Sequence, residues 1–421
     1  MVVMALVLTA GGYVLASLGG RSASLPANLV PFLIAVVALL GGAHVATRRL
    51  APKADALLLP MAALLNGLGY VFIARLDRNL AGLQAVWTAL GVGAFVATLL
   101  FVRRTRDIER FRYTFALLGI GLLLLPLAPV IGRNINGSRL WVRFAGITFQ
   151  PGEMAKIALC IFFASYLVEK REVLSQFTRQ VGPISVPHVR HLGPLVLAWG
   201  ASLVVMIAEK DLGSSLLFFA LFVSMLWVAT DRNVYLVFGG LMFAAGSFFS
   251  WKAFAHVQER VHIWHNPWPV ANAAGYQIVQ ALFAFAAGGL FGVGLSHGNP
   301  GRIPAVSTDF IFAAIGEELG LFGCGAILLA FLLMIGTGMR IALRAENPFD
   351  KLLAAGLTTI FGIQGFIIVG GVTRLVPLTG ITLPFVSYGG SSLISNYVLL
   401  ALLLRISDQE TGRATVRLAE Q

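Results

Sequence analysis

Asp309 is the residue whose type and position best suit acid–base chemistry. It follows Thr308 at the end of a long polar segment and precedes an apolar run that begins Phe310-Ile311-Phe312, with no basic residue beside it in the sequence. A carboxylate at such a boundary is partly desolvated and can take a proton from a hydroxyl group. The alternative is a structural role, because a carboxylate placed before a helix also caps its free amide groups.

Two further acidic residues, Glu317 and Glu318, follow in the same region. On one continuous helix, Asp309 and Glu317 would share a face about two turns apart. This spacing predicts a supporting acidic group on the face that carries Asp309.

A second cluster contains Glu153 and Lys156, three positions apart and just after Pro151. Proline suits the first turn of a helix, and side chains three apart lie on one helix face. The two charges can neutralise each other as a structural ion pair. The other interpretation gives Lys156 a role in binding a substrate phosphate.

A third cluster, Glu209-Lys210-Asp211, divides two apolar runs and predicts a tight turn between two helices. Asp211 stands directly before the second run, where a carboxylate caps amide groups and complements the helix dipole. The functional alternative is a part in a site on the outer face of the membrane.

Several other patterns carry little weight. The glycines of residues 289–294 resemble a phosphate loop but follow no strand of a βαβ unit. His262 and His265 lack a third metal ligand in the sequence nearby. Cys160 and Cys324 lie inside apolar runs without a spacing motif, so neither a disulfide framework nor a metal site is supported.

The elements that must position these residues are membrane helices. The 421 residues are 57% hydrophobic and 12% charged, whereas a soluble domain is about 25% charged. The apolar runs are about 20 residues long and do not alternate, which excludes a β-barrel. We therefore expect an all-α integral membrane protein, a polytopic bundle of about twelve spans. The expected spans are residues 2–19, 29–47, 56–74, 82–102, 113–131, 152–168, 192–208, 212–230, 234–251, 312–339, 352–373 and 385–404.

The net charge of +12 is read as an orientation signal and not as a sign of nucleic-acid binding. If the N-terminus is cytoplasmic, about nineteen basic residues lie on the cytoplasmic side and about eleven outside. Residues 252–311 then form a long extracellular loop, in which the short apolar stretch 277–287 predicts an interfacial or re-entrant helix. Loops of this length tend to be functional.

Taken together, these motifs resemble the SEDS family (shape, elongation, division and sporulation) of membrane peptidoglycan glycosyltransferases, and among its branches RodA most closely. Blocks that match in order lie at residues 136–141, 149–156, 211–213, 275–320 and 377–392, the last with the RodA-like Ser387-Tyr388-Gly389-Gly390-Ser391. The resemblance implies polymerisation of lipid II, a disaccharide-pentapeptide on undecaprenyl diphosphate, outside the bacterial cytoplasmic membrane. It also implies a class B penicillin-binding transpeptidase as partner, in wall elongation and cell-shape maintenance.

The resemblance also implies roles for single residues. Asp309 matches the family's essential acidic residue and would act as general base. The resemblance leaves open which groups stabilise the leaving diphosphate, among them Arg139, Lys156 and a divalent cation such as Mg²⁺ or Mn²⁺. The tentative substrate-binding residues are Arg139, Lys156, Asp211, Gln277, Thr308, Ser387 and Ser391.

The resemblance gives the expected organisation of the chain. Residues 1–50 would be an extra N-terminal helix pair, residues 51–406 the SEDS membrane domain and residues 407–421 a cytoplasmic tail. Membrane lipid surrounds the chain, and nucleic acid is not an expected partner. Three alternatives stay open: a lipid II flippase, a division-type polymerase of the FtsW kind, and a scaffold that only activates its transpeptidase partner.

Overall fold

The computed structural model describes residues 1–19, 29–129, 131–135, 138–144, 147–175, 179–181, 184–186 and 193–420. The chain divides into two compact units. The first unit contains Met1–Phe101, Glu259–Thr337 and Gln364–Gln421. The second unit contains Val102–Gln258 and Gly338–Ile363.

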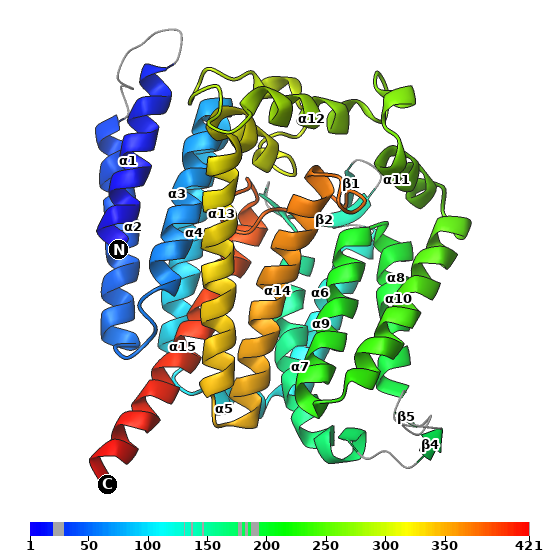
Figure 1. Cartoon of the computed structure of the whole chain (residues 1–421). Coiled ribbons are helices and arrows are strands. Elements are labelled where there is room, and N and C mark those ends of the chain that lie inside the picture. The colour runs from blue at the N-terminus through cyan, green and yellow to red at the C-terminus, as the bar shows by residue number, and fades with distance from the viewer. Residues whose placement is uncertain are drawn as a thin grey trace. The chain divides into compact units, whose positions relative to one another are not determined.

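In the first unit, an N-terminal helix pair packs against two further helices (Figure 1). These are α1 (Val2–Leu18), α2 (Leu29–Leu50), α3 (Leu58–Leu76) and α4 (Arg78–Phe101). Small residues bring the helices close: a Cβ at Gly67 on α3 would lie 1.9 Å from the hydroxyl of Thr9 on α1. Glycine is therefore required where α1 crosses α3.

The last helix, α15 (Gly390–Glu420), packs along α4 in the same unit. A Cβ at Gly91 of α4 would lie 2.6 Å from the ring of Tyr397, so the absent side chain makes room for this tyrosine. Tyr397 is fully buried and accepts a hydrogen bond from Asn66 Nδ2 over 2.9 Å. A buried phenol with a partner can thus be accommodated at membrane depth.

Between α4 and α15 in the sequence, the first unit contains the segment that leads to Asp309. It consists of α11 (Ala255–His265), whose first residues belong to the second unit, η3 (Trp268–Val270), α12 (Tyr276–Gly288) and η4 (Pro300–Arg302). The predicted short helix at 277–287 is confirmed by α12. A hydrophobic core joins α12, the residue after η4 and the start of α13. It includes Ile278, Ala281, Ile303, Phe310 and Ala313.

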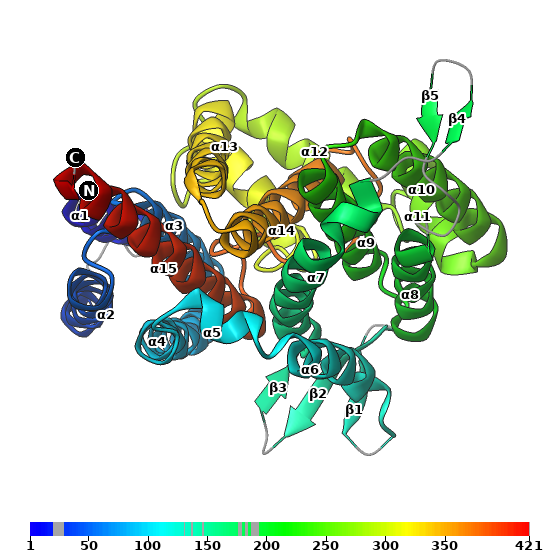
Figure 2. The ribbon, with the colours of Figure 1, turned by 90° about the horizontal axis from the view of Figure 1, so that it is seen from below.

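The second unit combines helices with two small sheets (Figure 2). Its helices are α5 (Thr105–Glu109), α6 (Arg112–Leu124), η1 (Leu125–Leu127), α7 (Gly152–Ser175), α8 (Gly193–Glu209), α9 (Leu212–Thr230) and α10 (Asn233–Ala253). Its strands are β1 (Gly132–Ile135), β2 (Ser138–Phe144) and β3 (Ile147–Phe149), paired antiparallel, and the hairpin β4 (Arg179–Val181) with β5 (Ile184–Val186). Leu123, Ala155, Leu159 and Phe218 form a core between α6, α7 and α9.

Two helices run through both units: α13 (Ile311–Arg344) and α14 (Pro348–Val372). Helix α13 is interrupted at Gly320, whose φ is +65°. A Cβ there would lie 2.3 Å from the backbone nitrogen of Gly292. Glycine is needed for both reasons, because the left-handed conformation and the close approach each disfavour a side chain.

A helix of the structure overlaps each of the twelve expected ranges, and the strands correct the all-α expectation. Trp141, Val142 and Phe144 are aromatic or β-branched residues, which favour a strand at 138–144. The expected span 113–131 is also shorter than predicted, since α6 ends at Leu124 and η1 contains Pro126. Helix α15 begins at Gly390 and continues to Glu420, so most of the expected tail is helical. Residue 192 lies outside the described residues.

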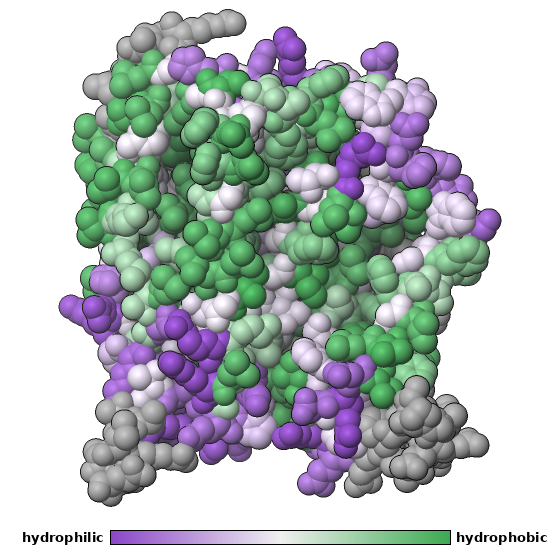
Figure 3. Space-filling model, in the orientation of Figure 1, coloured by the Kyte–Doolittle hydropathy of each residue, from purple (hydrophilic) through white to green (hydrophobic). Residues whose placement is uncertain are grey.

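Among the residues that the structure describes, eight helices have the length and composition to cross a membrane. They are α2 to α4, α9, α10, and α13 to α15, and three shorter apolar helices lie at Val2–Leu18, Arg112–Leu127 and Tyr276–Gly288. Apolar side chains cover α1 and α13 along their middle turns, whereas hydrophilic ones gather near helix ends (Figure 3). The chain is therefore a multi-pass helical membrane protein.

Candidate active site

Asp309 is half-buried at the end of the segment that precedes α13. The next residue, Phe310, is fully buried in the core with Ile278 and Ile303 and so anchors the backbone beside the carboxylate. Since α13 begins at Ile311, the residue directly before this helix is Phe310. Asp309 therefore lies one residue outside the usual capping position.

A tight turn centred on Ala305 sets the backbone before Asp309. The Ala305 carbonyl accepts hydrogen bonds from the Thr308 nitrogen over 3.1 Å and from the Thr308 hydroxyl over 3.0 Å. The Phe310 nitrogen also donates to it, over 3.4 Å. Ala305 has a φ of +53°, which is uncommon for a residue with a side chain. These bonds hold the Thr308–Asp309 peptide in one orientation.

The C-terminal block 377–392 contacts this turn from the opposite end of the sequence. Ser387 Oγ donates to the Thr308 carbonyl over 2.5 Å, and the Tyr388 nitrogen donates to the Ser307 carbonyl over 2.8 Å. Ser387 Oγ also accepts from the Leu383 nitrogen over 3.0 Å. The structure thus brings together Thr308 and Ser387, two residues that the sequence had marked as substrate-binding candidates.

Gly380 lies against the Asp309 carboxylate. A Cβ at this position would lie 3.5 Å from Asp309 Oδ2, and Gly380 has a φ of +80°. The positive φ is a conformation that suits glycine. The sequence contained the Gly380 block but offered no sign of its contact with Asp309.

Two arginines that were not among the candidates hold the loop around Gly380. Arg260 Nη1 donates to the Leu378 carbonyl over 2.6 Å, and Arg374 Nη2 donates to the Trp264 carbonyl over 2.9 Å. Trp264 Nε1 in turn donates to the Arg374 carbonyl over 3.0 Å. Helix α11 therefore fixes both ends of residues 374–378. No local pattern in the sequence marks these two among the 31 lysines and arginines.

Tyr388 and Ser391 complete the block on the α4 side. Burial raises the pKa of the Tyr388 phenol, which is hydrogen-bonded to Trp87, so Tyr388 is neutral at ordinary pH. A Cβ at Gly390 would lie 2.2 Å from the Trp87 ring, so the indole packs directly on the start of α15. Ser391 is buried in the first turn of that helix.

Gln277, Glu317 and Glu318 form hydrogen bonds with the backbone of loops. They do not share a helix face with Asp309. Gln277 Nε2 donates to the Pro304 carbonyl over 2.7 Å, next to the Ala305 turn. Glu317 and Glu318 accept hydrogen bonds from the Asn299 nitrogen and the Ser296 nitrogen over 2.8 and 3.0 Å. The condition for a shared face, one continuous helix from Asp309 to Glu317, is not met, because α13 begins at Ile311.

In the second unit, Glu153 and Lys156 form the expected ion pair. Lys156 Nζ lies 2.6 Å from Glu153 Oε2, and the two side chains are 1% and 8% exposed. A buried pair of this kind leaves one charge uncompensated if the other is removed. The structure therefore confirms that the two side chains form an ion pair.

Asp211 caps α9, as the sequence suggested. Its Oδ1 accepts from the Gly213 nitrogen over 2.9 Å, and its Oδ2 accepts from the Ser214 hydroxyl. Lys210 has a φ of +57° and completes the sharp turn from α8. Ser138 Oγ, at the start of β2, donates to the Lys210 carbonyl over 3.5 Å. The exposed Arg139 therefore follows directly after the point where β2 meets this turn.

The candidates thus belong to two groups. Asp309, Gln277, Thr308, Ser387, Ser391, Glu317 and Glu318 lie in the first unit, and Arg139, Glu153, Lys156 and Asp211 lie in the second. Asn136 and Gly137 of the first sequence block lie outside the described residues. Within the described residues, no three His, Cys, Asp or Glu side chains cluster as a metal site would require. A divalent cation stays a prediction.

Comparison with known proteins gives consistent results. A family model for FtsW, RodA and SpoVE, described as "Cell cycle protein", matches residues 57–412. The "Peptidoglycan glycosyltransferase RodA" of Mycobacterium tuberculosis is 46% identical over 393 residues, which cover 91% of this chain and 84% of that protein. The "Probable peptidoglycan glycosyltransferase FtsW" of Geobacter metallireducens is 34% identical over 349 residues, with 82% and 87% covered.

A solved structure resembles the fold as well. Its chain, from work described as "Structural coordination of polymerization and crosslinking by a peptidoglycan synthase complex", aligns with a TM-score of 0.69 and 26% identity. The alignment covers 85% of this chain and 98% of that one. The fold around the candidate site is therefore shared with a protein of known structure.

Proposed function

We propose that this chain is a peptidoglycan glycosyltransferase of the RodA type, because it belongs to the FtsW/RodA/SpoVE family of cell cycle proteins. Its 46% identity to a RodA over 91% of the chain supports this activity. The lower identity to an FtsW, 34%, favours wall elongation and cell-shape maintenance over division. The proposed substrate is lipid II, which serves as both glycosyl donor and acceptor.

In the proposed reaction, the acceptor's GlcNAc 4-hydroxyl attacks the donor's anomeric carbon. The new glycosidic C–O bond forms as the bond from the anomeric carbon to the diphosphate oxygen breaks. The electron pair of that bond leaves with undecaprenyl diphosphate, and the hydroxyl proton passes to the Asp309 carboxylate. Asp309 thus acts as general base.

The observation that carries this proposal is how the Asp309 carboxylate is presented. It is half-buried and stands on a backbone anchored by the buried Phe310, and a Cβ at Gly380 would lie 3.5 Å from its Oδ2. The Ser387–Thr308 hydrogen bond joins the two loops that carry these residues. A base held in one orientation by surrounding hydrogen bonds is what efficient proton transfer requires.

Negative charge grows on the leaving diphosphate, and cationic side chains can stabilise it. Arg139 is the stronger candidate for this role, because it is exposed, whereas Lys156 is already paired with Glu153 at 2.6 Å. Thr308 and Ser387 are proposed to bind substrate through the polar rim of the Asp309 turn, and Ser391 through the first turn of α15. Gln277 and Asp211 act by holding the Pro304 loop and the start of α9.

The proposed setting follows from the same family. The chain would cross the bacterial cytoplasmic membrane about twelve times, with residues 1–50 as an additional helix pair and the Asp309 turn facing outwards. Residues 51–406 form the glycosyltransferase domain, and residues after 406 are cytoplasmic. A class B penicillin-binding transpeptidase is the proposed partner, supported by the likeness to a chain from a peptidoglycan synthase complex.

Polymerisation of lipid II by the purified full-length chain tests the proposal. We expect the wild type to make glycan strands and Asp309→Asn to make none, because the amide cannot accept the proton. Glu259→Gln is the matched control, since Glu259 is an exposed carboxylate on α11 of the same unit. Retained activity in Asp309→Asn would exclude Asp309 as the base. Adding a chelator tests the divalent cation, and an assay of lipid II translocation in liposomes tests the flippase alternative.

A further inference from the structure

The end of α1 contacts the loop that leads towards Asp309. We call residues 289–299 the outer glycine loop. Its Ser296 Oγ donates a hydrogen bond to the Ala16 carbonyl over 2.6 Å. Its Leu295 packs against a cluster that contains Tyr13, Ala16 and Phe32 of the N-terminal helix pair. Both a side-chain hydrogen bond and an apolar contact therefore join the N-terminal pair to this loop.

The hydrogen bond satisfies a group that the helix itself leaves open. The last four carbonyls of a helix have no amide donor within the helix. Ala16 is in the last turn of α1, which ends at Leu18, whereas the preceding Leu15 carbonyl is bonded to the Gly19 nitrogen over 2.9 Å. The hydroxyl of Ser296 thus completes the end of α1.

The same loop is held on its other side by α3 and α13. Glu318 Oε2 accepts from the Ser296 nitrogen over 3.0 Å, and Glu318 Oε1 lies 2.6 Å from Arg75 Nε. Arg75 Nη2 also donates to the Gly298 carbonyl over 2.8 Å, and Glu317 Oε1 accepts from the Asn299 nitrogen. Ser296 is therefore bonded through its side chain to α1 and through its backbone to α13.

Ser296 adopts a backbone conformation that favours glycine, with a φ of +67°. Its neighbours Gly292 and Gly294 also have positive φ, but they are glycines. A residue with a side chain in this region is uncommon and indicates a specific role when the surroundings hold it in place. The contact with Ala16 supplies such a role for the hydroxyl.

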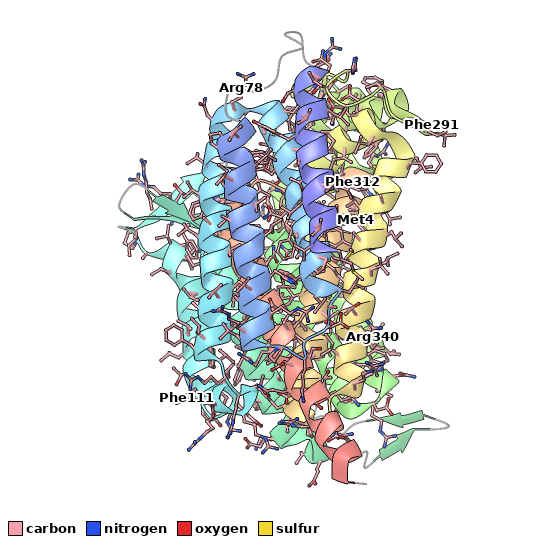
Figure 4. All side chains as sticks on the ribbon, turned by 90° about the vertical axis from the view of Figure 1, so that its left-hand side faces the viewer. Met4, Arg78, Phe111, Phe291, Phe312 and Arg340 are labelled. Carbon is pink, nitrogen blue, oxygen red and sulfur yellow. The ribbon has the colours of Figure 1, made fainter. Side chains whose placement is uncertain are left out.

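The outer glycine loop continues directly into the segment that carries Asp309. Pro300 is buried, and Ile303 packs in the core beside Phe310, the residue after Asp309. Exposed groups of the loop, such as Phe291 at 78% exposure, project away from the fold (Figure 4). The buried anchors leave few ways to move the loop without moving the Asp309 turn.

We propose that Ser296 is a positioning residue through which the N-terminal helix pair fixes the outer glycine loop and hence Asp309. This inference rests on the proposed function. Helices α1 and α2 lie outside the residues 57–412 that match the family model. They would nevertheless contribute to the reaction, by holding a loop of the matched region in place.

Two substitutions at Ser296 in the full chain test this role. Ser296→Gly removes the hydroxyl and suits the positive φ, and Ser296→Ala removes the hydroxyl but keeps the backbone strain. We expect both variants to show faster amide hydrogen exchange in residues 289–299. We also expect kcat for lipid II polymerisation to fall about tenfold with KM nearly unchanged, since small displacements of a catalytic group can cost up to about a hundredfold in rate.

Ser17→Ala is the matched control, because Ser17 Oγ donates inside α1 itself, to the Tyr13 carbonyl over 2.9 Å. It should exchange and polymerise like the wild type. A wild-type kcat in Ser296→Gly would overturn the proposal, whether or not amide exchange is faster. A lowered kcat in Ser296→Ala alone would also overturn it, because it would indicate an effect of backbone strain. If the wild type makes no glycan, the proposed function is wrong and the positioning role is wrong with it. Unchanged amide exchange in Ser296→Gly would separately show that the contact with α1 does not hold the loop.

Discussion

The hydroxyl of Ser387 joins two loops that are far apart in the sequence. It donates to the Thr308 carbonyl over 2.5 Å while accepting from the Leu383 nitrogen over 3.0 Å. The side chain is buried, so both bonds are shielded from water. Ser387 thereby ties the loop of Gly380 to the turn of Asp309.

Replacing this hydroxyl should loosen the site. We expect Ser387→Ala to lower the free energy of unfolding by about 1–3 kcal/mol, because the Leu383 amide and the Thr308 carbonyl lose a buried partner. Polymerisation should also slow, since the two loops are no longer joined beside Asp309. Initial rates with lipid II and thermal unfolding in detergent measure the two effects.

Thr373→Ala provides the control for the Ser387 experiment. Thr373 Oγ1 is exposed and donates to the Val369 carbonyl within α14, over 2.8 Å. This variant loses a hydroxyl near the same loop without separating it from the Asp309 turn. Equal rates for Ser387→Ala and Thr373→Ala would show that the Ser387–Thr308 bond does not matter for activity.

A side chain at Gly380 should impair the site directly. We expect Gly380→Ala to cost about 1–2 kcal/mol of stability, because its φ of +80° disfavours any residue with a Cβ. The new methyl group would also lie 3.5 Å from Asp309 Oδ2, in ordinary van der Waals contact, and would place an apolar group beside the proton acceptor. The polymerisation rate of Gly380→Ala should therefore fall by more than its loss of stability explains, as measured by thermal unfolding.

Gly301→Ala is the comparison for Gly380→Ala. Gly301 lies in η4, and a Cβ there would meet no atom within 4 Å. Near-wild-type activity is expected for it. The interpretation of Gly380 would be wrong if both glycine variants were equally active.

Local patterns in the sequence predicted the helices and their caps well. Backbone groups in a bilayer must bond within their own segment, so apolar runs of sufficient length become helices. The break at Glu209-Lys210-Asp211 was predicted, and α8 ends at Glu209 while α9 begins at Leu212. Asp211 caps α9 through the Gly213 amide and the Ser214 hydroxyl, two donors that follow it within three residues.

Contacts between distant segments could not be predicted. The interruption of α13 at Gly320 depends on the backbone of Gly292, and Gly380 lies beside the Asp309 carboxylate. The ion pair of Arg75 with Glu318 likewise joins α3 to α13. Such partners are set by tertiary packing, and no local spacing encodes them. The strand β2 was missed because its seven residues show no regular alternation of apolar and polar side chains.

The buried pair Glu153–Lys156 should act mainly on stability. We expect Lys156→Met to reduce the free energy of unfolding by about 3–5 kcal/mol, because Glu153 would remain buried without its partner at 2.6 Å. The double variant Glu153→Gln with Lys156→Met should recover part of this loss. A double-mutant cycle of thermal unfolding measures the coupling between the two residues.

Activity distinguishes this structural role from phosphate binding by Lys156. If the pair is structural, the folded double variant should polymerise lipid II at a rate close to that of the wild type. If Lys156 also binds the diphosphate, the double variant should regain stability but stay slow, with a raised KM.

Arg139 and Arg143 allow a paired test of diphosphate binding. Both are exposed and lie on β2, four residues apart, with an irregularity in the pairing of β2 with β1 between residues 138 and 141. Arg139 adjoins Ser138, which contacts the α8–α9 turn.

If Arg139 stabilises the leaving diphosphate, Arg139→Ala should lower kcat/KM about tenfold to a thousandfold, as the loss of one charge-stabilising group does elsewhere. Arg143→Ala should have little effect, and raised ionic strength should slow the wild type more than Arg139→Ala. Equal losses in the two variants would indicate a general effect of positive charge and would exclude a specific site at Arg139.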